Sequence, residues 1–138
     1  MFVWKSSFEL GIPSIDQQHK ELFEIGNRVL DLLVTKNEDI DDFDEIIDLA
    51  FQLKAYTQYH FQTEEKLFEK YDYPDREAHI QSHDTFIKYI DQFDFSNAKL
   101  NQREVLDEML DHLSKWIFNH IITTDYMYKT FLIEKGIR

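Results

Sequence analysis

The chain contains no cysteine, and only three glycines and two prolines stand among its 138 residues. The lack of cysteine excludes disulfide bonds, thiolate zinc sites, cysteine-ligated iron–sulfur clusters and a cysteine nucleophile. So few turn-forming residues argue against the many tight turns of a β-sandwich or a β-barrel. A chain without cysteine also suits a reducing compartment, and we expect a cytoplasmic protein.

Basic residues are scarce as well, because 15 Lys and Arg stand against 27 Asp and Glu, for a net charge of −12. Nucleic acids and anionic membrane surfaces would be repelled, so neither is expected as a partner. No apolar run is long enough for a membrane span or a secretory leader. Hydrophobic residues nevertheless make up 43% of the chain, with twelve Phe. We therefore expect one folded domain over residues 1–138.

The apolar residues recur at intervals of three and four, which is typical of helices that pack in a bundle. Short connections make successive helices antiparallel neighbours. The predicted fold class is therefore all-α, an antiparallel up-down-up-down four-helix bundle. The four helices are predicted at about residues 15–36, 40–71, 74–93 and 101–134.

Residues 1–13 lack helical periodicity but carry apolar side chains, so we predict an ordered N-terminal arm that docks on the bundle. Ser14 and Gln17 have the spacing of a capping box and predict the start of the first helix. Pro74 is placed in the first turn of the third helix, where proline is well tolerated.

Five of the six histidines lie on the inward-facing stripes of these helices, and so does one glutamate. His60 and Glu64 are four residues apart, as are His79 and His83, and side chains at this spacing share a helix face. A single histidine on such a stripe is more often a hydrogen-bonded core residue than a ligand. Several imidazoles together with carboxylates instead predict a transition-metal site, for Fe, Zn, Cu or Ni. The residues concerned are His19, His60, Glu64, His79, His83 and His120.

Asp125 follows His120 by five residues, a spacing that turns its side chain away from the stripe on an ideal α-helix. A π-helical turn or a break near residues 121–124 would return the side chain to the stripe, and π-turns occur often at functional sites. Without such a turn, Asp125 would be an ordinary solvated acid.

The six residues named above, together with Asp125, resemble in order and spacing the ligand pattern of the hemerythrin family, specifically the single-domain bacterial hemerythrins. The similarity covers almost the whole chain and includes Ile15-Asp16-x-Gln18-His19, His60-Phe61-x-x-Glu64-Glu65, Tyr73-Pro74 and Trp116. The resemblance implies an oxo- or hydroxo-bridged centre of two non-haem iron ions. By position, it implies that His79, His83 and His120 bind one iron, His19 and His60 the other, and Glu64 and Asp125 bridge both.

The resemblance also implies reversible dioxygen binding, for storage, delivery or sensing, by a protein that is not an enzyme. Two alternatives stay open: a di-iron enzyme (oxidase, peroxidase or nitric oxide reductase) and an iron-holding regulatory bundle. Oxygen-activating enzymes of the ferritin-like class use paired Glu-x-x-His motifs, and the chain contains none. We expect a monomer that binds dioxygen, with any redox partner unidentified.

Five apolar or aromatic residues flank the predicted ligands and are expected to pack in the core. The resemblance implies that they also form a dry wall around the open iron, with Ile122 over the oxygen site. His112 matches no ligand position and is expected to be partly exposed, and Glu65 is expected on the surface. The wall residues are Phe61, Trp116, Ile121, Ile122 and Tyr128.

Overall fold

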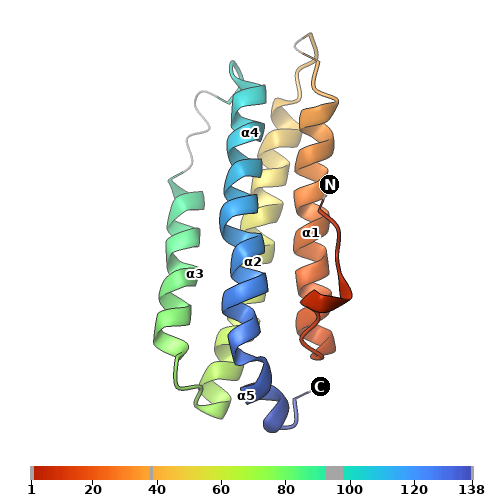
Figure 1. The fold of residues 1–138 in the computed structure, drawn as a ribbon. Helices are drawn as coiled ribbons and strands as arrows, with labels where there is room; N and C mark the ends of the chain where they lie inside the picture. Colours follow the sequence, from red (N-terminus) through yellow and green to blue (C-terminus); the bar gives the residue numbers. More distant parts are fainter. Residues whose placement is uncertain (1, 38, 93–97, 138) are drawn as a thin grey trace.

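The computed structural model describes residues 2–37, 39–92 and 98–137, and within these ranges it contains helices and no β-strand. The long helices run alternately up and down in one elongated bundle, with α1 beside α4 and α3 at the opposite edge (Figure 1). The predicted four-helix bundle is confirmed. The helices are α1 (Pro13–Val34), α2 (Phe43–Tyr71), α3 (Arg76–Asp91), α4 (Gln102–His112) and a short α5 (Lys129–Glu134).

The start of α1 differs from the prediction. The helix begins at Pro13, whose fixed φ suits a first turn, and Ser14 is not its cap. The Asp16 carboxylate reaches back instead and accepts hydrogen bonds from the backbone N–H groups of Leu10 (2.8 Å) and Gly11 (3.1 Å). The chain therefore enters the helix through a turn that Asp16 holds.

The connection between α2 and α3 is also longer than predicted. Asp72 ends α2 in the left-handed conformation, with a φ of 56°. The chain needs further residues to complete this reversal, so Pro74 lies in the turn and α3 begins only at Arg76. The Arg76 guanidinium closes the turn at 2.8 Å from the Asp72 carboxylate. The predicted end of the third helix at Phe93 lies outside the described residues.

The N-terminal arm is ordered and docks on the bundle, as predicted. The Asn27 side chain holds Phe2 through two hydrogen bonds, accepting one from its N–H (2.8 Å) and donating one to its carbonyl (2.9 Å). The Phe2 ring lies 4.2 Å from that of Phe118. A β-carbon on Gly26 would lie 2.7 Å from the Phe118 ring, so a larger residue here would force that ring to shift.

Two apolar clusters form the core and leave a polar layer between them. The larger includes Leu22 and Phe61, and the smaller includes Ile15 and Phe68. Along α1, His19 falls between Ile15 and Leu22, and along α2, Glu64 falls between Phe61 and Phe68. The predicted metal ligands therefore lie in a layer between two dry regions.

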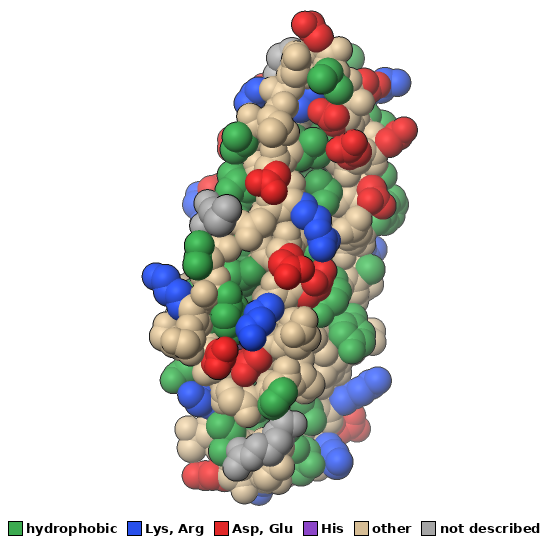
Figure 2. Space-filling view, turned by 90° about the vertical axis from the view of Figure 1, so that its right-hand side faces the viewer, with side chains coloured by type: hydrophobic (Ala, Val, Ile, Leu, Met, Phe, Trp, Pro, Cys, Tyr) green, Lys and Arg blue, Asp and Glu red, His purple; other side chains and the backbone are tan. Residues whose placement is uncertain are grey.

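The surface carries both signs of charge. On the face drawn in Figure 2, acidic and basic side chains alternate with apolar ones, and none of the described residues visible there is a histidine. No helix within the described ranges is both long and apolar enough to span a membrane.

Candidate metal centre

Seven buried polar side chains meet in the layer between the apolar clusters. Helix α1 contributes one, α2 two and α3 two, and the last two come from the continuation of α4. All are 5% exposed or less, and four of them are fully buried. They are His19, His60, Glu64, His79, His83, His120 and Asp125.

A π-helical turn, one of the two arrangements that would return Asp125 to the stripe, is present between His120 and Asp125. Beyond His112, the chain continues as two π-helical segments, Leu113–Phe118 and His120–Thr124. Because a π-helix pairs residues five apart, Asp125 returns to the face that carries His120. The Asp125 Oδ1 atom lies 3.1 Å from His120 Nε2.

The seven side chains divide into two groups, and within each group one ligand atom per residue lies within 4.8 Å of all the others. Asp125 belongs to both groups. Its Oδ1 atom lies 2.8 Å from His79 Nε2, and its Oδ2 atom lies 3.0 Å from His19 Nε2. The groups are His79, His83, His120 and Asp125, and His19, His60, Glu64 and Asp125.

Glu64 also faces both groups. Its Oε1 atom lies 3.2 Å from His60 Nε2 and 3.3 Å from His83 Nε2. Two carboxylates thus stand between three imidazoles on one side and two on the other. This is the division that the resemblance to the hemerythrin family implies.

Many of the inward-facing atoms have no hydrogen-bond partner within the described chain. They include both Glu64 oxygens, Asp125 Oδ1, and the Nε2 atoms of His79, His83 and His120. A buried polar atom without a partner costs about 1–3 kcal/mol. Two bound cations would give these atoms ligand bonds, and imidazole with carboxylate suits iron and similar transition metals. The residues present therefore fit a pair of transition-metal ions.

Without metal, the charges of the cluster are set by its carboxylates. Burial alone would lower the pKa of His60, but Glu64 and Asp125 outweigh burial and raise it to about 10. Burial is likewise outweighed at His83, where Glu64 and Glu65 raise the pKa to about 9. Metal ligation requires neutral imidazoles, so metal and protons compete for these sites.

Three of the imidazoles have a polar side chain near their outer nitrogens, and the ligand spacing in the sequence predicts none of these three partners. His60 Nδ1 donates to Gln18 Oε1 at 2.7 Å, and His120 Nδ1 lies 3.2 Å from Ser82 Oγ. Gln18 and Ser82 directly precede ligand-type histidines in the sequence, which is the only local signal for them.

Glu65 is the third outer partner, and it lies at the surface as expected, lining a hollow between α2 and α3. The side chain is 29% exposed, but its Oε2 atom lies 3.6 Å from His83 Nδ1. Neighbours on a helix point to different faces, yet a glutamate side chain is long enough to reach across the narrow space between α2 and α3.

Aromatic rings cover the imidazoles on the side of the larger apolar cluster. Phe61 stacks on His83, with ring centroids 3.9 Å apart. Trp116 stacks on His120 at 4.6 Å. Both rings exclude water from the imidazole faces that they cover.

Tyr128 covers the opposite end of the site. It is fully buried, and its ring lies 5.7 Å from that of His79. Burial and the nearby carboxylates, Glu64 foremost, raise the pKa of its hydroxyl well above the usual value, so Tyr128 is a neutral part of the wall.

Ile122 does not cover the site, and its prediction as the wall over the open iron is wrong. It is 40% exposed and lines a surface hollow with Phe23 and Phe118. Ile121 is the buried residue of the pair, at 2% exposed. Residues two apart on a helix point to nearly opposite faces, so the position of Ile122 two residues after the buried His120 favours this outward orientation.

His112 lies outside both ligand groups. It is half-buried, as expected, and its ring stacks on those of Tyr89 (3.4 Å) and Phe86 (5.4 Å). Burial lowers the pKa of its imidazole. His112 therefore packs between α3 and α4 as a neutral ring.

Fold and site together define a helical-bundle protein with a buried cluster of histidines and carboxylates suited to metal. The family model described as the Hemerythrin HHE cation binding domain matches residues 10–132. The chain belongs to the hemerythrin family.

Named relatives and solved structures agree with this assignment. A bacteriohemerythrin of Clostridium acetobutylicum is 41% identical over 129 residues, which cover 93% of this chain and 98% of the relative. A bacteriohemerythrin of Stenotrophomonas maltophilia is 32% identical over 93% of this chain and 79% of its own length. The crystal structure of a wild-type hemerythrin shares the fold, with a TM-score of 0.72 and 23% identity over 94% of this chain and 96% of that one.

Proposed function

We propose that the chain holds two iron ions in the buried cluster and binds dioxygen reversibly there, as a carrier, store or sensor rather than an enzyme. The observation that supports this most strongly is the pair of ligand groups that share Asp125. His79, His83 and His120 would hold one ion, and His19 and His60 the other, with Glu64 and Asp125 between them. Cytoplasmic location and a monomeric state stay predictions from the sequence.

The unequal division of imidazoles supports binding at one of the two ions. Three histidines on one side and two on the other leave fewer protein ligands at the ion held by His19 and His60. When bound, a pair of ferrous ions supplies the two electrons and the open position that reversible dioxygen binding needs. Two carboxylates offset only part of the charge of two divalent ions, which suits a buried site that must also accept an electron-rich ligand.

The chain's own residues keep this site dry. Phe61 and Trp116 stack on imidazoles, and Ile121 is buried in the same apolar cluster as Phe61. A small apolar surround excludes water. Water would supply the protons with which reduced oxygen could leave, and the irons would then remain in the ferric state. Exclusion of water therefore favours the release of unchanged dioxygen over the permanent oxidation of the two irons.

The test begins with protein reduced and loaded with ferrous iron under anaerobic conditions. We expect two irons per chain, an absorption band in the visible spectrum on exposure to air, and loss of that band when the gas is removed. His112→Ala serves as the control and should leave iron content and spectrum unchanged. One metal per chain, or a band that persists after gas removal, would contradict reversible binding. Sustained consumption of dioxygen with an added reductant would favour an enzyme.

A further inference from the structure

The side chain of His83 is only 1% exposed. Its outer nitrogen, Nδ1, is therefore shielded from water, yet it has no hydrogen-bond partner within the described chain. The carboxylate of Glu65 lies next to it, with Oε2 3.6 Å from Nδ1. Among the described residues, Glu65 is the only one that brings a carboxylate within 4.0 Å of the outer nitrogen of a histidine in the cluster. Gln18 and Ser82, the partners of His60 and His120, are neutral.

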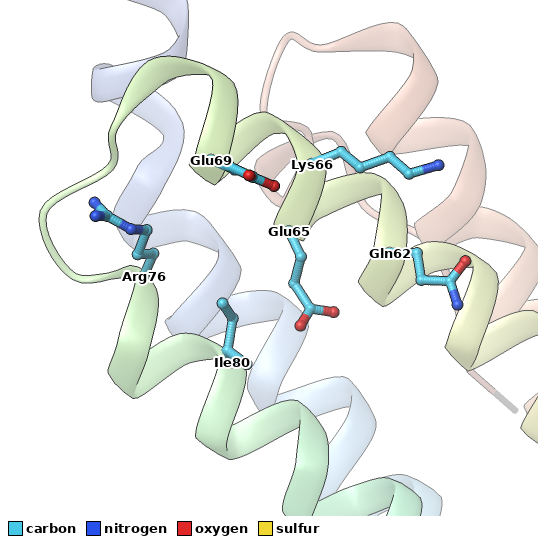
Figure 3. A pocket seen from close by; sticks show the side chains of 6 residues that line it. All are labelled: Gln62, Glu65, Lys66, Glu69, Arg76 and Ile80. Carbon is cyan, nitrogen blue, oxygen red and sulfur yellow. The ribbon is translucent and has the colours of Figure 1, made fainter.

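Glu65 reaches this position from a surface hollow between α2 and α3. The hollow has a volume of about 600 Å³ and is also lined by Gln62, Lys66, Glu69, Arg76 and Ile80. In Figure 3, the Glu65 carboxylate projects between the two helices, whereas the charged ends of Lys66 and Arg76 point away from it. Arg76 pairs with Asp72 instead. The carboxylate is therefore open to water on one side and faces His83 on the other.

We propose that Glu65 is a positioning residue of the metal centre, which accepts a hydrogen bond from His83 Nδ1–H and thereby holds Nε2 toward the metal. The proposal rests on the proposed function, since it needs a metal at His83. A rotation of the flexible Glu65 side chain closes the remaining distance. Carboxylates in this outer position fix the tautomer and the ring orientation of a ligand histidine and raise its basicity.

The negative charge of Glu65 also has a consequence for redox chemistry. An imidazole that donates to a carboxylate is a stronger electron donor than one that donates to an amide or a hydroxyl. It stabilises the ferric state of the ion it binds more than the ferrous state. Of the two ions, the one held by His79, His83 and His120 should therefore be the more easily oxidised.

Two variants of Glu65 and one matched control test this role. Glu65→Gln keeps the size and an acceptor oxygen but removes the charge, and Glu65→Ala removes both. Glu69→Gln removes a charge from the same hollow without touching a ligand histidine. Circular dichroism of the metal-free proteins checks that all three variants fold.

The first readout is affinity for cobalt(II), measured by competition with a chelator and by the ligand-field spectrum of the bound ion. We expect Glu65→Ala to weaken binding of one of the two ions about 10–100-fold, with a smaller loss in Glu65→Gln. The second readout is the midpoint potential of the iron-loaded protein, which should become more positive in both Glu65 variants. Glu69→Gln should behave as wild type in both measurements.

The outcomes separate this proposal from the one on which it rests. A wild-type chain that fails to bind two ions would overturn the proposed function, and the role of Glu65 with it. Two-ion binding in the wild type, with affinity and potential unchanged in Glu65→Ala, would overturn the role of Glu65 alone. Equal shifts in the Glu65 and Glu69 variants would also overturn it, because they would show a general effect of surface charge.

Discussion

His120 and Asp125 are five residues apart in the sequence, yet their side chains meet, with Asp125 Oδ1 3.1 Å from His120 Nε2. The π-helical turn His120–Thr124 makes this possible. The same turn brings the second Asp125 oxygen to 3.0 Å from His19 Nε2, on the other side of the cluster. One local change of helical geometry thus links the two ligand groups.

Asp125→Asn should reduce metal binding below two ions per chain. The amide keeps the size of the side chain but presents only one oxygen, so it can face only one of the two groups. Metal analysis after loading and dialysis measures the loss. Asp111→Asn removes an exposed acid of α4 that pairs with Lys115, and should retain full metal content. Full loading of Asp125→Asn would show that its carboxylate does not link the two ions.

Ile121→Ala and Ile122→Ala should differ sharply in stability, although the two residues are adjacent. Loss of the buried Ile121 side chain should cost about 2–5 kcal/mol, because it leaves a cavity in the core. Loss of the partly exposed Ile122 side chain should cost less than about 1 kcal/mol. Urea unfolding of the metal-free proteins gives both values. Similar costs at the two positions would mean that the turn is oriented differently.

The metal-free protein should lose stability at alkaline pH through His60. The pKa of His60 is raised from 6.5 to about 10 in the folded chain. The stabilisation that its protonated form provides is therefore fully present below about pH 6.5 and is lost as the pH rises through about 10.

Denaturant unfolding between pH 6 and pH 10 measures this loss. The stability of His60→Gln should fall less steeply with pH than that of the wild type, since lysines and tyrosines titrate equally in both proteins. Parallel curves would show that His60 carries no proton in the metal-free cluster.

Asn27→Ala should loosen the N-terminal arm. The variant loses both hydrogen bonds to the backbone of Phe2, each of which contributes about 0.5–1.5 kcal/mol. Trypsin should then cleave faster after Lys5, which lies in the arm. Asn119→Ala, at an exposed position between the two π-helical segments that continue α4, should leave the cleavage rate unchanged. An unchanged rate in Asn27→Ala would mean that the aromatic contacts of Phe2 suffice to hold the arm.

Much of the fold was predictable because its signals are local. Apolar spacing of three and four predicts helices whatever their partners, and short connections leave an antiparallel bundle as the compact arrangement. The helix starts were less predictable. Ser14 and Pro74 have good local capping and first-turn signals, but the carboxylate of Asp16 and the left-handed Asp72 decide where α1 and α3 begin.

The sequence by itself determined that His60 and Glu64 share one helix face, and that His79 and His83 share another, because residues four apart lie on the same side of a helix. Only the tertiary structure decided how the chain turns after His120, since a π-helical turn depends on packing against the other helices. That turn directs Asp125 inward. The contact of Glu65 with His83 was also beyond the sequence, because it depends on the spacing between α2 and α3 rather than on either helix alone.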